Sequence, residues 1–336
     1  MKCWGNNNDG QLGDGTTDDS PTPVDVDGLT SGVVAIAAGY SHSCAVTESG
    51  GVRCWGSNSY GQLGNATTTD SLTPVDVDGL ASGVVAVATG YFHTCALTSA
   101  GGMKCWGYNA LGQTGDQTTT NRSTPVDVIG LTSGVAAIAA ADRHVCAVTT
   151  AGDTKCWGLN TEGQLGNGTT ANSVVPVNVT GLTGIASAIA IYDRHSCALT
   201  TAGGVKCWGN NDGGALGDGN SPNDRNTPVD VDGLPSGIAA VSAGNGMSCA
   251  VTVSGTAKCW GSNFAGQLGD GSTTSSDTPV DVAGLGASLM SGSAQAVFST
   301  DALAADLMAA GGKPAAMRSP RTMKATTTST RAPPRV

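Results

Sequence analysis

The chain has 336 residues and a formal net charge of −10, and this charge is unevenly distributed. Residues 1–284 carry ten Lys and Arg against 24 Asp and Glu, whereas residues 285–336 carry six against two. The acidic part argues against binding nucleic acid through this region, because phosphate contacts need a cluster of Lys and Arg. No apolar run approaches the roughly 20 residues of a membrane-spanning helix.

A short motif, Cys-Trp-Gly-x-Asn followed by a glycine-rich loop, recurs six times along the chain. Its tryptophans are Trp4, Trp55, Trp106, Trp157, Trp208 and Trp260. The step between them is 51 residues four times and then 52, with the extra residue between Gly217 and Pro228. A fixed period of this size is typical of propellers and solenoids.

In chain order, residues 1–26 hold half a repeat, and the first full repeat follows. Short β-branched or alternating runs predict strands at 33–38, 43–47, 52–55 and 74–77, the last of them opened by proline. Four short antiparallel strands without helical periodicity describe a propeller blade. The fold class is therefore all-β, a β-propeller of four-stranded blades of about 51 residues.

The repeats divide the chain into three parts. Residues 1–284 form the propeller domain, with an N-terminal half-blade and five complete blades at 33–77, 84–128, 135–179, 185–231 and 238–282. Residues 285–300 could supply degenerate closing strands, and 301–336 form a low-complexity basic tail that we expect to be disordered. No secretory signal precedes the repeats, and the first residues match the middle of a repeat, so we expect the natural protein to begin further upstream.

The repeat resembles that of the regulator-of-chromosome-condensation family, in a variant with Cys-Trp-Gly typical of bacteria. The resemblance covers residues 1–282 and rests on Gly-x-x-His-x-x-Ala-(Val/Leu)-Thr, as in Gly39 to Thr47, and on Cys-Trp-Gly-x-Asn-x-x-Gly-Gln-Leu-Gly. It implies a β-propeller, usually of seven blades, so five complete blades would be an incomplete or truncated ring. The family founder is a nucleotide exchange factor for a small GTPase and binds chromatin, and bacterial relatives include a secreted inhibitor of β-lactamases. The chain lacks the founder's added β-wedge and a basic face.

The cysteines form five pairs, each ten residues apart across a predicted hairpin turn. We predict that Cys44 pairs with Cys54, Cys95 with Cys105, Cys146 with Cys156, Cys197 with Cys207, and Cys249 with Cys259. A turn centred on residue 49 would place Cys44 opposite Cys54, close enough for a disulfide. The alternative is that they are small buried residues that pack between sheets. We favour disulfides, which indicates an oxidising compartment, and Cys3 has no partner in its half-blade.

The polar residues that recur at one repeat position give no enzyme signal. The histidines are His42, His93, His144 and His195, with Met247 at the same position of the fifth full repeat. We expect each to form a structural hydrogen bond inside its own blade rather than to bind metal. The recurring loop asparagines should hold turns, since the Asp-Gly loops lack the ligand pattern of a calcium site. Catalytic groups form singular constellations, so this repetition argues against an enzyme and no cofactor is expected.

Two loops vary between otherwise similar repeats: the one before the histidine and the one after Cys-Trp-Gly. They hold, or lie beside, the candidate partner-binding residues Tyr40, Tyr60, Tyr91, Phe92, Tyr108, Arg143, Tyr192, Arg194 and Phe264. Aromatic side chains on loops of a rigid scaffold suit protein recognition, although a single one could instead cover a blade edge. We therefore expect a monomeric, non-catalytic protein-binding scaffold, extracellular or at the cell surface, with an unidentified protein partner. The alternatives are an intracellular exchange factor or GTPase-binding regulator and, third, an enzyme inhibitor, a glycan-binding protein or a glycan-active propeller enzyme.

Overall fold

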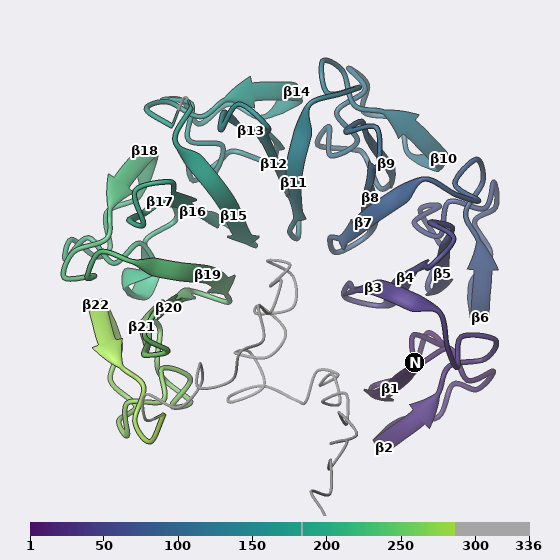
Figure 1. Cartoon of the computed structure of the whole chain (residues 1–336), viewed down its shortest axis with the longest axis horizontal. Coiled ribbons are helices and arrows are strands. Elements are labelled where there is room, and N and C mark those ends of the chain that lie inside the picture. Colours follow the sequence, from purple (N-terminus) through teal and green to yellow (C-terminus); the bar gives the residue numbers. More distant parts are fainter. Residues whose placement is uncertain (183, 286–336) are drawn as a thin grey trace, which may run out of the picture.

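The computed structural model describes residues 1–182 and 184–285, and these form an arc of β-sheets around a common centre (Figure 1). A two-stranded antiparallel sheet of β1 (Lys2–Gly5) and β2 (Ser20–Asp25) lies at one end of the arc. Five four-stranded antiparallel sheets follow, and the blade of β19–β22 lies at the other end. The family resemblance and the period predict these propeller blades, and the structure confirms them.

The five blades share one topology, in which consecutive strands are neighbours and the first strand lies nearest the centre. The blade next to the N-terminal sheet contains β3 (Val33–Ala38), β4 (His42–Thr47), β5 (Val52–Gly56) and β6 (Ser71–Asp76). The others are β7 (Val84–Thr89), β8 (His93–Thr98), β9 (Met103–Gly107) and β10 (Arg122–Asp127); β11 (Val135–Ala140), β12 (His144–Thr149), β13 (Thr154–Gly158) and β14 (Ser173–Asn178); β15 (Ala186–Tyr192), β16 (His195–Thr200), β17 (Val205–Gly209) and β18 (Arg225–Asp230); and β19 (Ile238–Gly244), β20 (Met247–Thr252), β21 (Ala257–Gly261) and β22 (Ser276–Asp281).

The outermost strand of each blade begins earlier than its proline suggested. β6 starts at Ser71, three residues before the predicted start at Pro74, and its register with β5 shifts between Cys54 and Gly56. Proline is tolerated here because an edge strand has one side without a pairing partner, where a missing N–H costs little. The bulge then lets the strand continue past the irregular pairing.

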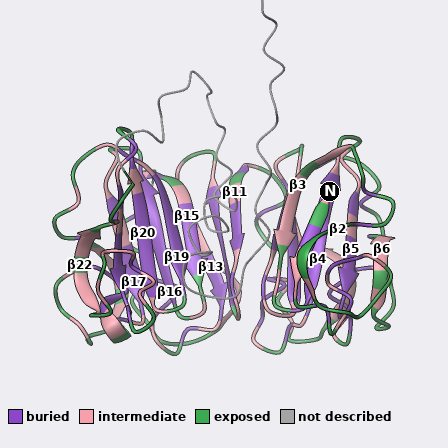
Figure 2. Ribbon diagram, turned by 90° about the horizontal axis from the view of Figure 1, so that it is seen from below, coloured by how far each residue is buried: buried purple, intermediate pink, exposed green. Residues whose placement is uncertain are grey.

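The hydrophobic core lies between neighbouring blades, and the second and third strands of the blades, such as β16, β17 and β20 in Figure 2, are largely buried. One cluster joins Val148 of one blade to Ile189 and Trp208 of the next. The Trp208 indole N–H also donates a hydrogen bond of 2.8 Å to the Gln164 carbonyl of the preceding blade. The tryptophan of each complete blade thus fastens that blade to the preceding sheet, which makes the scaffold under the loops rigid.

Each complete blade contains one disulfide between its second and third strands. Cys44 lies directly opposite Cys54 and is bonded to it, as the turn centred on residue 49 predicts. The other four bonds join Cys95 with Cys105, Cys146 with Cys156, Cys197 with Cys207, and Cys249 with Cys259. The structure therefore confirms all five predicted pairs, and the alternative of unbonded cysteines packed between sheets is wrong for them. Cys3 is a buried free thiol, and burial raises its pKa to about 11.

The remaining predictions about the chain concern membrane spans and the C-terminal part. None of the helices in the described residues is long and apolar enough to cross a membrane. The predicted closing strands at 285–300 lie, apart from residue 285, outside the described residues, as does the tail at 301–336.

Candidate protein-interaction face

Two loops of every blade open on the same face of the arc. Because the strands alternate in direction, the loop between the first and second strands and the loop between the third and fourth lie at one end of the sheet. The tight turn between the second and third strands lies at the opposite end. The sequence varies most in the first two loops, and we call the surface that they form the loop face.

The loop between the first and second strands carries different side chains at one repeat position. This position holds Tyr40, Tyr91, Asp142, Asp193 and Asn245 in successive complete blades. The following position holds Ser41, Phe92, Arg143, Arg194 and Gly246. Since the first strands lie nearest the centre, the centre of the loop face changes from aromatic to charged to polar around the arc.

Five of the predicted residues form an aromatic patch, which consists of Tyr40, Tyr60, Tyr91, Phe92 and Tyr108. The rings of Tyr40 and Tyr91 stack with centroids 3.9 Å apart, and Phe92 meets Tyr91 edge-on at 4.6 Å. Tyr60 contacts both Phe92, at 5.1 Å, and Tyr108, at 5.0 Å. Offset and edge-on pairs of this kind stabilise each other, so the patch is ordered in advance of binding. Tyr40 is nevertheless 66% exposed.

Charged residues adjoin the patch on the next two blades. The Arg143 guanidinium lies 3.3 Å from the Asp142 carboxylate, and Arg194 lies 3.5 Å from Glu162 and 3.7 Å from Asp193. Partial burial raises the pKa of Asp142. The Arg143 guanidinium opposes this shift, and the nearby carboxyl of Asp193 adds to it. Two carboxyl groups from neighbouring blades therefore meet beside the aromatic patch.

Contacts across the boundary join the aromatic and charged parts. The pKa of Tyr91 is raised to about 12, chiefly by the neighbouring hydroxyl of Tyr40 and then by partial burial and the negative charge of Asp142. Tyr192 also has a raised pKa, because it is partly buried and lies near Asp193 and Asp142. The loop face is thus one continuous surface from Tyr40 to Asp193.

A hollow of about 370 Å³ continues the loop face over the last two blades. It is open to solvent, and its lining includes Arg194, Asp212, Asn245 and Phe264. The Phe264 side chain is 82% exposed at this place. The hollow gives the surface a concave end, which a protruding side chain of a partner could enter.

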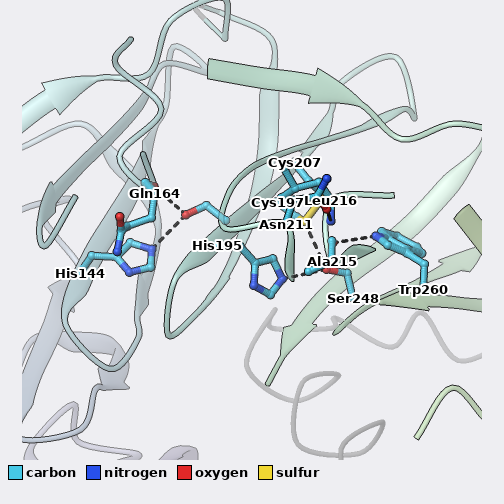
Figure 3. The surroundings of a disulfide bond; sticks show 11 residues. His144, Gln164, His195, Cys197, Cys207, Asn211, Ala215, Leu216, Ser248 and Trp260 are labelled. Carbon is cyan, nitrogen blue, oxygen red and sulfur yellow. Dashed lines mark hydrogen bonds between the residues drawn. A yellow bond between two sulfur atoms is a disulfide. The ribbon is translucent and has the colours of Figure 1, made fainter. Parts of the chain in front are cut away.

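The recurring histidines lie beneath this face and link neighbouring blades. His144 Nε2 is 3.0 Å from Ser196 Oγ of the next blade, and Ser196 donates its proton to the Gln164 carbonyl. Figure 3 labels the equivalent residues one blade further on, His195, Ser248 and Ala215. Since the hydroxyl proton is used for the carbonyl, the hydroxyl accepts from His144 and Nε2 carries the imidazole proton. The prediction of a bond inside each histidine's own blade was wrong, because the second strand of the neighbouring blade supplies the hydroxyl.

We call this chain of bonds, from histidine to hydroxyl to loop carbonyl, the relay. It also occurs at His42 with Thr94 and at His195 with Ser248, where Nε2 lies 2.9 Å from the hydroxyl oxygen in each case. It is broken at His93, where Val145 takes the hydroxyl position and neither ring nitrogen has a hydrogen-bond partner. Burial lowers the pKa to about 4 for His42 and His195 and to about 3 for the other two. The described residues contain no group of three or more side chains that could hold a metal ion.

The loop asparagines hold the long loop that carries Tyr60 and its equivalents. Asn58 Oδ1 accepts from the Leu63 N–H at 2.9 Å, and its Nδ2 donates to the Thr67 carbonyl at 3.2 Å and the Thr69 carbonyl at 3.0 Å. This confirms the predicted turn role. Equivalent bonds are formed by Asn7, Asn109, Asn160, Asn211 and Asn263.

The structure brings only some of the candidate residues together. Arg143 and Arg194 lie in the charged part, Tyr192 ends β15 near them, and Phe264 stands apart at the hollow. Sequence reasoning did not include Asp142 and Asp193 in the site. Their signal was available, since they occupy the same repeat position as Tyr40 and Tyr91.

Comparison with known proteins gives a consistent picture of the repeats. The sequence model described as the RCC1-like domain matches residues 1–301. The chain is 32% identical over 285 residues to the ultraviolet-B receptor UVR8 of Arabidopsis thaliana, covering 83% of this chain and 64% of that protein. It is 32% identical over 292 residues to the mitochondrial RCC1 domain-containing protein RUG3 of the same plant, covering 83% of this chain and 65% of that protein. The chain therefore spans just under two thirds of these relatives.

Solved structures share the fold. Human WBSCR16 superimposes with a TM-score of 0.71 at 21% identity, covering 83% of this chain and 77% of that one. Prp20p of Saccharomyces cerevisiae gives a TM-score of 0.60 at 20% identity, covering 84% of this chain and 85% of that one. At such identities the likeness concerns the architecture alone, so function has to be argued from the loop face.

Proposed function

Because this chain belongs to the RCC1-like domain family, we propose that it is a non-catalytic protein-binding module that recognises its partner through the loop face. The observation that carries the proposal is the aromatic patch. Five Tyr and Phe side chains from two neighbouring blades contact one another on loops that the scaffold holds rigidly. Clustered, preordered aromatic residues supply the anchors of protein interfaces at a small entropic cost.

The charged residues beside the patch fit the same role. Arg143 and Arg194 are more than half exposed, and their partners are acidic side chains of the same face. Exchangeable ion pairs beside an aromatic patch provide specificity and orientation. The repeated, hydrogen-bonded histidines and asparagines beneath have structural roles, which supports a scaffold rather than a catalyst.

Five disulfides support an extracellular or cell-surface location, because such bonds persist in oxidising compartments. The second candidate is an intracellular GTPase-binding regulator. It is favoured by the fold shared with Prp20p, whose structure was reported together with its binding to Gsp1p and histones. Free thiols in the native protein and accelerated nucleotide release from a small GTPase would select the second candidate.

The test compares two variants as bait for partners. Tyr91→Ala with Phe92→Ala removes the centre of the patch, whereas Val253→Ala alters an exposed apolar side chain at the opposite end of a blade, in the turn after β20. A partner captured by the wild type and by Val253→Ala, but lost with the double variant, would then be purified and its affinity measured. We expect the double variant to weaken binding by about a hundredfold, the loss of two aromatic anchors. Equal binding by all three proteins would contradict the proposal.

A further inference from the structure

The geometry points to the chemistry of the partner, which we infer to be an arginine-bearing basic segment. Its guanidinium group stacks on the aromatic patch and pairs with the Asp142 carboxylate, and this inference rests on the proposed function. This goes beyond protein binding in general, because it names the side chain that the loop face selects.

The charge of the described part of the chain favours a cationic partner. Every Lys and Arg side chain of residues 1–182 and 184–285 already has a polar partner, nine of them an Asp or Glu and Lys155 the amide of Asn178. Asp and Glu outnumber Lys and Arg by 24 to ten in residues 1–284. The surface of these residues thus carries excess negative charge, and this attracts basic segments.

The loop face adds a place where a cation can bind. Tyr40, Tyr91, Asp142 and Asp193 follow one another at equivalent positions around the centre, so that ring faces and carboxylates adjoin. On this side of the face the acidic residues Asp142, Asp193, Glu162 and Asp212 outnumber Arg143 and Arg194. In the Arg143–Asp142 pair the guanidinium is more than half exposed at 3.3 Å from a partly buried carboxylate, so a guanidinium from a partner can take its place.

Arginine suits this arrangement better than lysine. Its planar guanidinium stacks on an aromatic ring and at the same time donates two parallel hydrogen bonds to a carboxylate, whereas an ammonium group is a strongly hydrated point charge. Tyr40 is the most exposed ring of the patch and its ring is stacked on Tyr91, beside Asp142. A guanidinium group can therefore use the ring face and the carboxylate together.

The test uses three fluorescent glycine-serine peptides of one length that carry several arginines, the same number of lysines, or the same number of neutral citrullines. Binding to the full chain is measured by fluorescence anisotropy at physiological salt. We expect the arginine peptide to bind at least about fivefold more tightly than the lysine peptide, and the citrulline peptide not to bind. Asp142→Asn and Tyr91→Leu should each weaken arginine-peptide binding by about tenfold, whereas Glu48→Gln, in the turn at the opposite end, should leave it unchanged.

Equal affinity for arginine and lysine peptides, with no effect of the patch variants, would show diffuse attraction to an acidic surface and overturn the inference. Two other occupants would also overturn it. Self-association in sedimentation velocity that Tyr91→Leu abolishes would make a second copy the occupant. Arginine-peptide binding that appears only after the six Lys and Arg of residues 313–335 are changed to glutamine would make the chain's own tail the occupant.

The inference and the proposed function can fail separately. If the captured partner depends on Tyr91 and Phe92 but is insensitive to Asp142→Asn and to citrulline replacement of its arginines, the protein-binding function stands and arginine recognition is wrong. If no partner depends on the loop face while the arginine peptide still binds to wild type and not to the patch variants, the proposed function fails and the chemical preference remains.

Discussion

Replacing Val145 with threonine should repair the interrupted relay beneath the loop face. Val145 is fully buried and occupies the place where the other blades have a serine or threonine hydroxyl. Its neighbour His93 is fully buried too, and both of its ring nitrogens lack a partner. The acceptor for a new hydroxyl is already in place, since the Gln113 carbonyl accepts the Trp157 indole N–H at 2.9 Å, as Gln62 and Gln164 do in the intact relays.

The magnitude follows from the bonds gained and the apolar group lost. Threonine has nearly the shape of valine, and its hydroxyl would accept from His93 and donate to Gln113, as Thr94 does at 2.9 Å for each of its two contacts. Each bond contributes about 1 kcal/mol, and exchanging a buried methyl for a hydroxyl costs about the same as one bond. We therefore expect Val145→Thr to raise the free energy of unfolding by about 1 kcal/mol.

The assay is chemical denaturation with the disulfides intact, comparing midpoints at equal slopes. Thr94→Val, which creates the same defect at His42, is the matched reverse change and should cost about 1 kcal/mol, because the same two bonds are lost and the apolar group is regained. His93→Met copies the residue that Met247 provides in the last described blade, and combined with Val145→Thr it measures the coupling. A coupling energy near zero, or a clear loss of stability with Val145→Thr alone, would refute the relay.

Three further outcomes can be checked. Because burial lowers the pKa of the four histidines below the ordinary 6.5, the folded protein should be fully stable above pH 6.5. Below that pH the unfolded chain takes up protons, and the free energy of unfolding should fall by about 2 kcal/mol per histidine at pH 5; denaturation midpoints that stay constant between pH 7 and 5 would contradict this. Intact mass after alkylation of protein from an export-competent host should show five disulfides and one thiol, Cys3, that reacts only on unfolding, whereas eleven free thiols would favour an intracellular protein. Removing one disulfide with Cys95→Ala and Cys105→Ala should lower the free energy of unfolding by about 3 kcal/mol in thermal or chemical denaturation. Gly64→Ala should cost about 2 kcal/mol or more, because the backbone has φ +71° and the new Cβ would lie 2.6 Å from Trp106 Nε1, and an unchanged melting temperature would count against the close packing.

The fold was predictable because each blade repeats the same local rules. The 51-residue period, the glycine turns and the alternating runs are all local signals, and the ten-residue cysteine spacing places each pair across a hairpin. The outer strands were less predictable. Pro74 reads as a strand start, yet the bulge beside Gly56 lets the strand begin at Ser71.

Contacts between blades could not be predicted from one repeat alone. The hydroxyl that His42 needs lies 52 residues further along, in the next blade, and nothing in the local pattern of His42 points to Thr94. The same holds for the meeting of Asp142 with Asp193, because only the radial arrangement of the blades brings equivalent positions side by side. The aromatic patch was predicted as a set of residues, but its stacking order needed the structure.

The interblade bonds explain how the loop face can vary while the scaffold stays the same. In an intact relay one loop carbonyl, such as that of Gln62, accepts both the Trp106 indole and the Thr94 hydroxyl, and the hydroxyl holds His42. The loop backbone is thereby fixed from below by residues that face away from solvent. The side chains two positions before the histidines take no part in the relay, so tyrosine, aspartate or asparagine fits there without changing the fold. Recognition can therefore change through the loop residues, while stability depends on the relay, the tryptophans and the disulfides.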